Sequence, residues 1–234
     1  MTFKEPIYKI LEWDSHFFNL NIGSLHCQSV NEAENFIQQI QKNSLDLLYT
    51  IIPDDNSTFK SSLLGNLVDI KYLYETNLSE VNNPNSHISI ILETSPKLYD
   101  LAYQSGYESR FKKDNKFKTG EFERFYKIWI DNSINKSIAD YVLGYYDDKE
   151  LKGFISLKIN GEKATIGLFA VDINDRGTGI GRQLIEAAKY YSFKNGAKKL
   201  FVATQKYNHR ACSFYQKNGF ILNNIETIYH KWFI

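Results

Sequence analysis

The stretch "RGTGIGRQL", Arg176 to Leu184, places three glycines directly before a helical pattern. Glycine allows a backbone to approach a ligand closely, and the first amides of a helix have no partner within that helix. These amides and the helix dipole together favour an anionic group at the helix N-terminus. The turn therefore predicts a phosphate site, and its surroundings have to decide which phosphate compound it holds.

Two common phosphate motifs do not fit this turn. A dinucleotide fingerprint, G-x-G-x-x-G, counted from Gly177 requires glycine where Arg182 stands, and no acidic residue lies near Lys199, where a ribose ligand is expected. A P-loop requires Gly-Lys followed by Ser or Thr, and the chain contains no such sequence. Coenzyme A remains as a third candidate for the phosphate compound that the turn holds.

The elements around the turn predict a mixed α/β domain. An aromatic-rich helix is expected over 121–134, and three strands follow over 138–147, 150–159 and 163–172, with a hairpin signal at Asn160-Gly161. After the turn we expect a helix over 181–195, a strand over 198–205, a helix over 208–219 and a last strand or hairpin. The resulting order is β-β-β-α-β-α-β.

The first part of the chain predicts a smaller α/β lobe. A helix is expected over 31–43, and strands over 45–52 and 67–75. The polar segment "VNNPNSH", Val81 to His87, is typical of a connection between two lobes. We therefore divide the chain into residues 1–95 and 96–234.

Composition limits the class of partner. The 234 residues are 43% hydrophobic and 24% charged, which is typical of a globular chain, and the net charge of +1 provides no broad field for nucleic acid or an anionic membrane. Cys27 and Cys212 lie far apart without metal-ligand spacing, and neither a signal peptide nor an apolar run of roughly 18 residues is found. We expect a cytoplasmic protein that uses no metal, does not insert into a membrane and acts on a small molecule.

Two motifs together resemble the GCN5-related N-acetyltransferase superfamily. Arg176, Gly179 and Gly181 spell R-x-x-G-x-G between an apolar strand and an amphipathic helix, and "YNHRACSFYQKNGF" over 207–220 is similar to the closing element of that family. The resemblance implies a mixed, twisted and splayed sheet flanked by helices, with the small lobe on the acceptor side. It also implies acetyl-CoA as the cosubstrate.

The same resemblance implies the residues that bind acetyl-CoA. They lie on the strand, on the turn and on the following helix: Phe169, Ala170, Val171, Arg176, Gly177, Thr178, Gly179, Ile180, Gly181, Arg182, Asn208 and Ala211. Tyr215 is implied as the general acid that protonates the departing CoA thiolate, which suits a phenol with a pKa of about 10. Direct transfer is expected, rather than an acyl-enzyme formed on Cys212 with His209 as its base.

Structural roles remain open for several of these residues. The glycine turn could serve conformation alone, Asn208 is also a potential helix N-cap, and Tyr215 could simply be a core aromatic residue. The base that takes a proton from the amine is also open, with Glu108, Asp114, Asp172, His230 and a water chain as candidates.

Upstream segments resemble the bacterial dTDP-fucosamine acetyltransferases and their relatives. These segments are "LEWDSHFFNLNIGSL" over 11–25, "ESRFKKDNKF" over 108–117 and "FYKIWIDNSINKSIADYVLGY" over 125–145. The resemblance implies a dTDP-linked amino-deoxysugar as the acceptor, in surface polysaccharide synthesis. In the expected loop at 109–117, Arg110, Phe111 and Phe117 are suited to a diphosphate and a stacked base.

Other interpretations remain beside this one. Trp13, Phe17 and Phe18 are expected to pack the small lobe beside a turn at Asp14 and Ser15. The acceptor could instead be another small amine or a protein amine, and a protein that binds CoA without catalysis is also possible. Exposed edge strands at the C-terminus would allow a homodimer, by analogy with the family.

Overall fold

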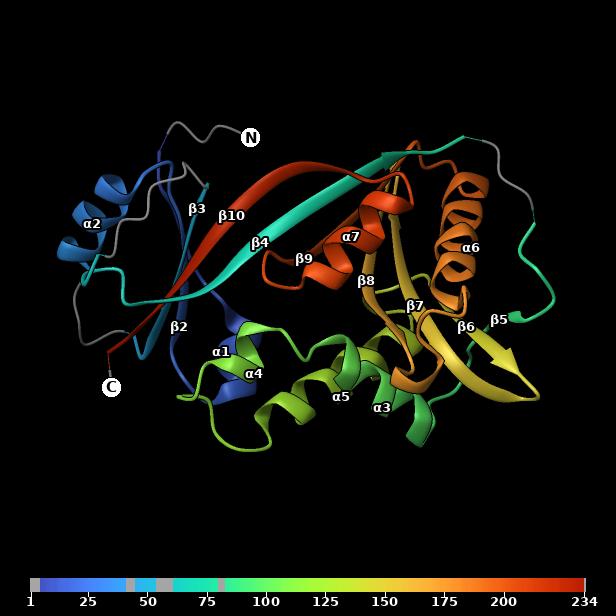
Figure 1. Ribbon diagram of the computed structural model, residues 1–234. Coiled ribbons are helices and arrows are strands. Elements are labelled where there is room, and N and C mark those ends of the chain that lie inside the picture. Colours follow the sequence, from blue (N-terminus) through green and yellow to red (C-terminus); the bar gives the residue numbers. More distant parts are fainter. Residues whose placement is uncertain (1–4, 41–44, 54–60, 80–82, 234) are drawn as a thin grey trace. The chain divides into compact units, whose positions relative to one another are not determined.

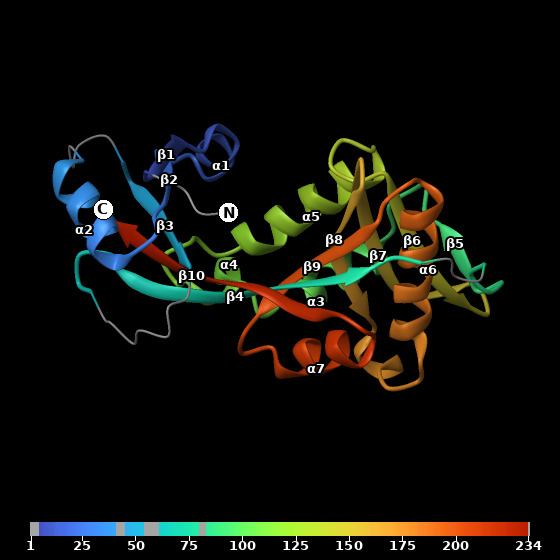
Figure 2. The same cartoon turned by 90° about the horizontal axis from the view of Figure 1, so that it is seen from above.

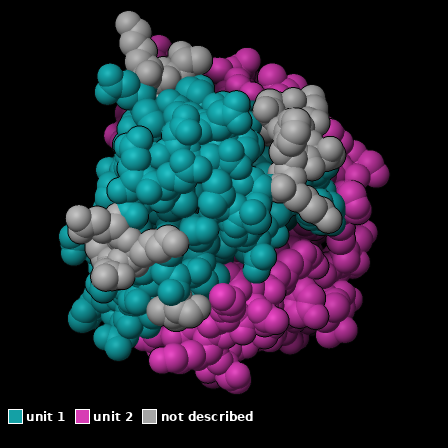
Figure 3. All heavy atoms as spheres, turned by 90° about the vertical axis from the view of Figure 1, so that its left-hand side faces the viewer, with its two compact units in different colours: residues 1–72, 205–207, 224–234 teal, residues 73–204, 208–223 magenta. Residues whose placement is uncertain are grey.

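The computed structural model describes residues 5–40, 45–53, 61–79 and 83–233. The chain divides into two compact units, coloured in Figure 3. Unit 1 comprises Met1–Tyr72, Gln205–Tyr207 and Asn224–Ile234, and unit 2 comprises Leu73–Thr204 and Asn208–Asn223. The division predicted from the sequence, at 95/96, separates an acceptor lobe from an acetyltransferase domain by their expected functions. It stays a prediction. Of the predicted connection at 81–87, Val81 and Asn82 lie outside the described residues.

Unit 1 contains β1, β2 and β3, parts of β4 and β10, and two helices (Figure 1). Its elements are β1 (Ile7–Ile10), α1 (Glu12–Phe18), β2 (Ile22–His26), α2 (Val30–Gln39), β3 (Leu47–Pro53) and the first part of β4 (Asn66–Asn77). β2 is antiparallel to β1 and parallel to β3, and β3 is antiparallel to the C-terminal strand β10 (Ile221–Trp232). Ala33 and Ile37 of α2 pack in a core with Leu25, Leu48 and Tyr229. The predicted helix and strands of this lobe are confirmed, although the helix ends at Gln39 and residues 41–43 of its predicted range lie outside the described residues.

The aromatic segment at 13–18 differs from its prediction. Asp14 and Ser15 lie inside α1 rather than in a turn. The Trp13 and Phe17 rings stack at 5.1 Å, as residues four apart do on one helical face. Phe18 packs edge-on against Phe17 at 4.7 Å. The expected packing role is confirmed for Phe17 and Phe18, which are 6% and 3% exposed, whereas Trp13 is 48% exposed. The prediction of a turn is wrong because the i, i+4 aromatic pair favours a helix.

Unit 2 holds the remaining elements. They are β5 (Ile88–Ile90), α3 (Pro96–Ser105), α4 (Arg110–Lys113), α5 (Glu121–Ile134), β6 (Tyr141–Asp147), β7 (Glu150–Asn160), β8 (Lys163–Val171), α6 (Ile180–Lys194), β9 (Lys199–Gln205) and α7 (His209–Lys217). β5, β6, β7 and β8 form an antiparallel series, and β8 and β9 are parallel. The predicted order around the glycine turn is confirmed, since α6 is the crossover that a parallel pair requires.

Helices cover both faces of this part of the sheet. α6 packs on β6, β7 and β8, whereas α3 packs on β7 and β8 and also on α5. Figure 2 shows α5 on one side of the strands and α6 and α7 on the other. Leu143, Phe154, Leu157, Leu184 and Ala188 are fully buried between these layers. Each large apolar side chain buried in this way contributes about 1.5–3 kcal/mol relative to exposure.

The ends of the sheet correct one expectation. The strand order is β1-β2-β3-β10-β4 through unit 1 and β10-β4-β9-β8-β7-β6-β5 through unit 2, with β4 and β10 shared. The C-terminal strand β10 therefore has a neighbour on each side, and in the described part of the sheet the edges are β1 and β5. The expectation of exposed C-terminal edge strands is wrong, because β10 is one long strand inserted between β3 and β4.

The segment at 109–117 also differs from the predicted loop. Residues Arg110–Lys113 form the short helix α4, whose C-cap is Asp114. Across the described ranges, no helix has both the length and the apolar character needed to cross a membrane. In the same ranges, no three His, Cys, Asp or Glu side chains gather in a way that could hold a metal ion.

Candidate functional site

The strands β8 and β9 separate halfway along their length. Their parallel pairing runs from Lys163 opposite Lys199 to Ile166 opposite Val202. β8 then continues to Val171 and β9 to Gln205 without further pairing between them. This separation leaves one edge of β8, over residues 167–171, open to a ligand, and it matches the splay that the family resemblance implied.

The alternation of a strand decides which backbone groups face this open edge. The Asp172 amide donates to the Lys152 carbonyl at 2.8 Å, so at this position β8 bonds to β7. Successive residues in a strand direct their N–H and C=O groups to opposite sides. Ala170 therefore directs its backbone groups to β7, whereas Phe169 and Val171 direct theirs to the open edge. Of the three strand positions expected to bind acetyl-CoA, the geometry favours these two.

A β-bulge precedes the open edge. Ile155 pairs with Phe169 and Leu157 with Ile166, so Ser156 of β7 lies opposite both Gly167 and Leu168. The buried Ser156 hydroxyl accepts a hydrogen bond from the Leu168 amide at 2.7 Å. A Cβ at Gly167 would lie 2.9 Å from Ser156 Oγ, which explains why glycine stands there. Bulges redirect the strand that follows, so Ser156 sets the direction of the Phe169 amide.

The glycine turn has the geometry of an anion site. Gly177 and Gly179 have φ values of +90° and +93°, and a Cβ at either position would point into open space. Gly179 is the N-cap of α6 and supplies no side-chain cap. In the described structure, the backbone amides of 177–182 donate no hydrogen bond to another residue, and the first bond of the helix joins Gln183 N to Gly179 O at 3.2 Å. The open amides and the missing Cβ atoms fit a diphosphate.

Arg176 is held by the protein rather than left extended. Its Nε donates to the Val171 carbonyl at 2.9 Å, and its Nη2 donates to Gln104 Oε1 at 3.3 Å. Partial burial lowers the pKa of Arg176, and the nearby charge of Arg210 lowers it further. The predicted contact between Arg176 and the diphosphate stays a prediction. It would use the guanidinium N–H groups that do not take part in these two hydrogen bonds.

Tyr215 lies at the open edge in an aromatic pocket. Its ring is 5.9 Å from Tyr74, 6.4 Å from Phe169 and 5.6 Å from Phe220, between ring centroids. The residue is 5% exposed, and burial raises its pKa above the usual value of a tyrosine. A phenol in this environment keeps its proton at neutral pH.

The prediction that Asn208 is a helix N-cap is confirmed at the start of α7. Asn208 is the N-cap, and its Oδ1 accepts from the Ala211 amide at 3.1 Å. Asn208 and Ala211, both predicted to bind CoA, are thus joined by this hydrogen bond. The bond uses the side-chain oxygen of Asn208, so the side-chain amide nitrogen remains as a donor to a ligand. Cys212 follows on the same helix and is partly buried.

Gly181 connects the turn to this helix. A Cβ at Gly181 would lie 3.1 Å from Phe214 and 3.5 Å from Phe169. Glycine therefore allows α6 to begin against α7 and β8, and the three parts of the predicted site meet at this point. A surface hollow beside them is lined by Arg182, Glu186, Lys217 and Asn218, of which only Arg182 was predicted from the sequence.

The predicted acceptor residues form a separate set. The Arg110 guanidinium lies 4.6 Å from the Phe111 ring centroid. Phe111 stacks on Phe125 of α5 at 4.3 Å and lies 5.7 Å from Phe117. The described contacts tie these residues to α5 rather than to the glycine turn. Their place in an aromatic cluster gives them a packing role, and their acceptor role stays a prediction.

The candidates for the base have unequal surroundings. Asp172 is 3% exposed and forms an ion pair with Lys97, which holds the pKa of its carboxyl below the usual value, so this carboxylate is a weak base. Glu108 pairs with Lys113 at 2.5 Å. Asp114 Oδ1 accepts from the Lys116 amide at 3.1 Å. His230 belongs to unit 1 and stacks on Tyr49 at 4.6 Å.

Comparison with known proteins agrees with this geometry. The model of the acetyltransferase (GNAT) family matches residues 99–220, more than half of the chain. The chain belongs to the acetyltransferase (GNAT) family. The matched residues include all of α3 from Tyr99 onward, the bulge, the splayed strands, the glycine turn and Tyr215. The family match therefore covers all the residues predicted to bind acetyl-CoA.

Individual relatives of this GNAT chain are more distant. It is 29% identical over 143 residues to a dTDP-fucosamine acetyltransferase of Escherichia coli O6:H1, covering 59% of this chain and 61% of that protein. The chain thus spans about three-fifths of the length of this curated relative.

Solved structures share the fold. A GCN5-related N-acetyltransferase from Sphaerobacter thermophilus is 13% identical, with a TM-score of 0.59 over 97% of this chain and 76% of that one. A functionally unknown protein from Staphylococcus epidermidis is 16% identical, with a TM-score of 0.61 over 92% of this chain and 85% of that one. At these identities the likeness concerns the fold, and it confirms the predicted fold class.

Sequence reasoning missed three residues that shape the site. Ser156 makes the bulge, and Lys97 and Gln104 of α3 contact the segment before the glycine turn. The "SPK" signal at Ser95 predicts a helix start, because Ser95 is an N-cap and Pro96 opens the helix. No sequence signal pairs Lys97 with Asp172, since that contact depends on the tertiary fold.

Proposed function

We propose that the chain transfers the acetyl group of acetyl-CoA to the amino group of a nucleotide-linked amino-deoxysugar. The nucleotide is dTDP, the product serves surface polysaccharide synthesis, and the reaction takes place in the cytoplasm. The observation that carries the proposal is the meeting of an open β8 edge, six unbonded amides at 177–182 and a protonated Tyr215 in one unit. The sugar acceptor is supported by the similarity to the dTDP-fucosamine acetyltransferase of Escherichia coli and by the upstream sequence resemblance.

The residues of the site have separate tasks in this reaction. Bound acetyl-CoA supplies an activated acetyl thioester, which an uncharged amine cleaves with release of the CoA thiol. The amides at 177–182 bind the diphosphate, and the open edge of β8 orients the pantetheine arm and the acetyl group. The Phe169 amide faces this open edge, where it would donate to the carbonyl oxygen as negative charge develops, and a preorganised donor of this kind lowers the barrier.

Tyr215 stabilises the leaving group, which is the CoA thiolate. Burial keeps a proton on its Oη at neutral pH, and that hydroxyl donates toward the sulfur as negative charge develops. The raised pKa also makes the phenol a weaker acid. Its effect is therefore greatest as a hydrogen-bond donor to a forming thiolate.

The acceptor is tested with a panel of amines. CoA release is measured with acetyl-CoA and dTDP-linked or UDP-linked amino-deoxysugars, free amino sugars, polyamines and amino acids. We expect selective turnover of a dTDP-linked amino sugar. Turnover of only polyamines or amino acids would refute the sugar acceptor and retain acetyl transfer, whereas binding of acetyl-CoA without any turnover would favour a non-catalytic CoA-binding protein.

A further inference from the structure

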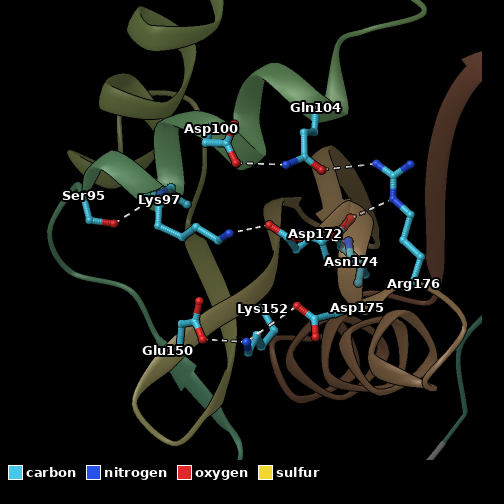
Figure 4. A network of polar contacts seen from close by, with 12 residues as sticks. Ser95, Lys97, Asp100, Gln104, Glu150, Lys152, Asp172, Asn174, Asp175 and Arg176 are labelled. Carbon is cyan, nitrogen blue, oxygen red and sulfur yellow. Dashed lines mark hydrogen bonds and ion pairs between the residues drawn. The ribbon is translucent and has the colours of Figure 1, made fainter.

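Helix α3 contacts the segment that leads into the glycine turn at two points. At the first, Lys97 Nζ forms an ion pair with Asp172 Oδ2, as Figure 4 shows. Asp172 also accepts a hydrogen bond from the Asn174 amide at 2.9 Å. The Asp172 side chain is 4% exposed and that of Lys97 is 35% exposed, so the carboxylate is buried beneath its lysine. The pair fixes the end of β8, one residue after Val171.

The second contact lies two turns further along α3. Gln104 Oε1 accepts from Arg176 Nη2 at 3.3 Å, and Gln104 Nε2 donates to Asp100 Oδ2 at 2.9 Å, which orients the amide (Figure 4). Arg176 is the last residue before Gly177. The five-residue segment 172–176 is thus fixed to α3 at both ends, and between them the Asp175 amide donates to the Asp172 carbonyl at 3.0 Å.

The glycine turn itself has few internal restraints. Between Arg176 and Ile180, Thr178 Oγ1 donates to the Asp175 carbonyl at 2.6 Å, and the Gly179 carbonyl accepts from the Gln183 amide at 3.2 Å. Ordering one residue costs about 1–2 kcal/mol of conformational entropy, and glycine has the most freedom to lose. On its C-terminal side the turn joins α6, which packs closely at Gly181, so the restraint on its N-terminal side comes from segment 172–176.

We propose that Lys97 and Gln104 are positioning residues that hold the glycine turn in its binding conformation and so set the affinity for acetyl-CoA. The inference rests on the proposed function, because it needs acetyl-CoA to bind at this turn. It assigns Asp172 to the anchor rather than to proton transfer. Neither residue touches the ligand; each acts through segment 172–176.

The test measures the dissociation constant of acetyl-CoA for the purified full chain by isothermal titration calorimetry. Lys97→Met removes the cation and keeps the length of the side chain, and we expect affinity to fall about tenfold, which corresponds to a modest loss of preorganisation. Lys97→Arg restores the charge and is expected to bind within about threefold of the wild type. This rescue separates positioning from simple loss of packing.

A matched control removes a similar ion pair elsewhere in unit 2. Lys158 pairs with Asp140 at 3.1 Å, and the side chains of this pair are 46% and 35% exposed. Lys158→Met therefore makes the same chemical change away from the turn, and its affinity should equal that of the wild type. Gln104→Ala tests the second contact independently and should also weaken binding.

Each result decides something. Weakening by Lys97→Met with rescue by Lys97→Arg, or weakening by Gln104→Ala, supports the inference. Wild-type affinity in both variants overturns the inference and leaves the proposed function standing. Equal weakening by Lys158→Met also overturns it, because a general loss of positive charge then explains the effect. A wild-type chain that does not bind acetyl-CoA refutes the proposed function and the inference with it.

Discussion

The ring of Phe169 on β8 lies 6.4 Å from the ring of Tyr215 on α7, between centroids. Phe169 belongs to the open strand edge, where its backbone amide faces the gap between β8 and β9. The contact thus places on neighbouring residues the two donors of the proposed reaction, the Phe169 amide for the acetyl oxygen and the Tyr215 hydroxyl for the sulfur. Each kind of donor lowers the barrier of acyl transfer when it is held in place beforehand.

Tyr215→Phe tests the proton donor. The variant keeps the ring contacts with Tyr74, Phe169 and Phe220 and loses only the hydroxyl, so the fold and acetyl-CoA binding should be unchanged. We expect the turnover number to fall about 10²–10⁴-fold, as for the loss of a general acid. CoA release at saturating acetyl-CoA is the measurement, and Tyr190→Phe on α6 is the control. Full turnover in Tyr215→Phe would leave Tyr215 with a packing role alone.

Gly179→Ala tests the anion cradle. At φ +93° an alanine costs about 1–3 kcal/mol of backbone strain, and its Cβ would occupy the open space above the turn. Gly196 ends α6 with φ +86°, and a Cβ there also meets nothing within 4 Å. Both alanine variants should lose similar thermal stability. Only Gly179→Ala should raise the Michaelis constant for acetyl-CoA, and an equal rise in Gly196→Ala would contradict the cradle.

Ser156→Ala tests the bulge. The change leaves the buried Leu168 amide without its acceptor, which costs about 1–3 kcal/mol. Since the bulge directs Phe169, the turnover number should fall as well. Ser192 is equally buried and donates to the Ala188 carbonyl at 2.6 Å inside α6, so Ser192→Ala is a matched control that should retain turnover. Urea unfolding measures the loss of stability, and CoA release measures the loss of turnover. Unaltered turnover in Ser156→Ala would show that the bulge has no role in catalysis.

Much of this site was predictable because its signals are local. Glycines with positive φ, the N-cap at Asn208 and the hydrophobic period of α6 are all determined within a few residues. The prediction of a phosphate turn between β8 and α6 followed from these signals. The bulge was not predictable, since Ser156 and Leu168 meet only when β7 and β8 pair.

The errors have two origins. The polar residues Asp14 and Ser15 indicated a turn, but the stacking of Trp13 on Phe17 stabilises a helix. This i, i+4 pair is a local signal that can be read from the sequence and was overlooked. The C-terminal strand was expected at an edge, and nothing in its sequence reports that β4 lies beside it. That second error depends on a contact that forms only in the folded chain.

The pH dependence distinguishes an anchor from a base at Asp172. Lys97 lowers the pKa of Asp172 in the folded chain, so the ion pair stabilises the fold above the unfolded pKa of about 3.9, and this contribution is lost as pH falls through the folded pKa. The wild type should therefore be more stable than Asp172→Asn at pH 7, and the difference should shrink below about pH 4. Denaturant unfolding at both pH values measures it.

The same variant also reports on activity. If Asp172 is an anchor, Asp172→Asn should keep the shape of the pH–rate profile between about pH 5 and 9, because a carboxyl with a lowered pKa does not titrate there. Loss of the acidic limb of that profile in Asp172→Asn would make Asp172 the base.

A crystal structure of the chain with CoA tests the central claim most directly. The account predicts diphosphate oxygens about 2.7–3.2 Å from the backbone nitrogens of 177–182. It also predicts the sulfur beside Phe169 and the Tyr215 hydroxyl, in the gap between β8 and β9. CoA bound away from this gap, or with its diphosphate away from the glycine turn, would contradict the account.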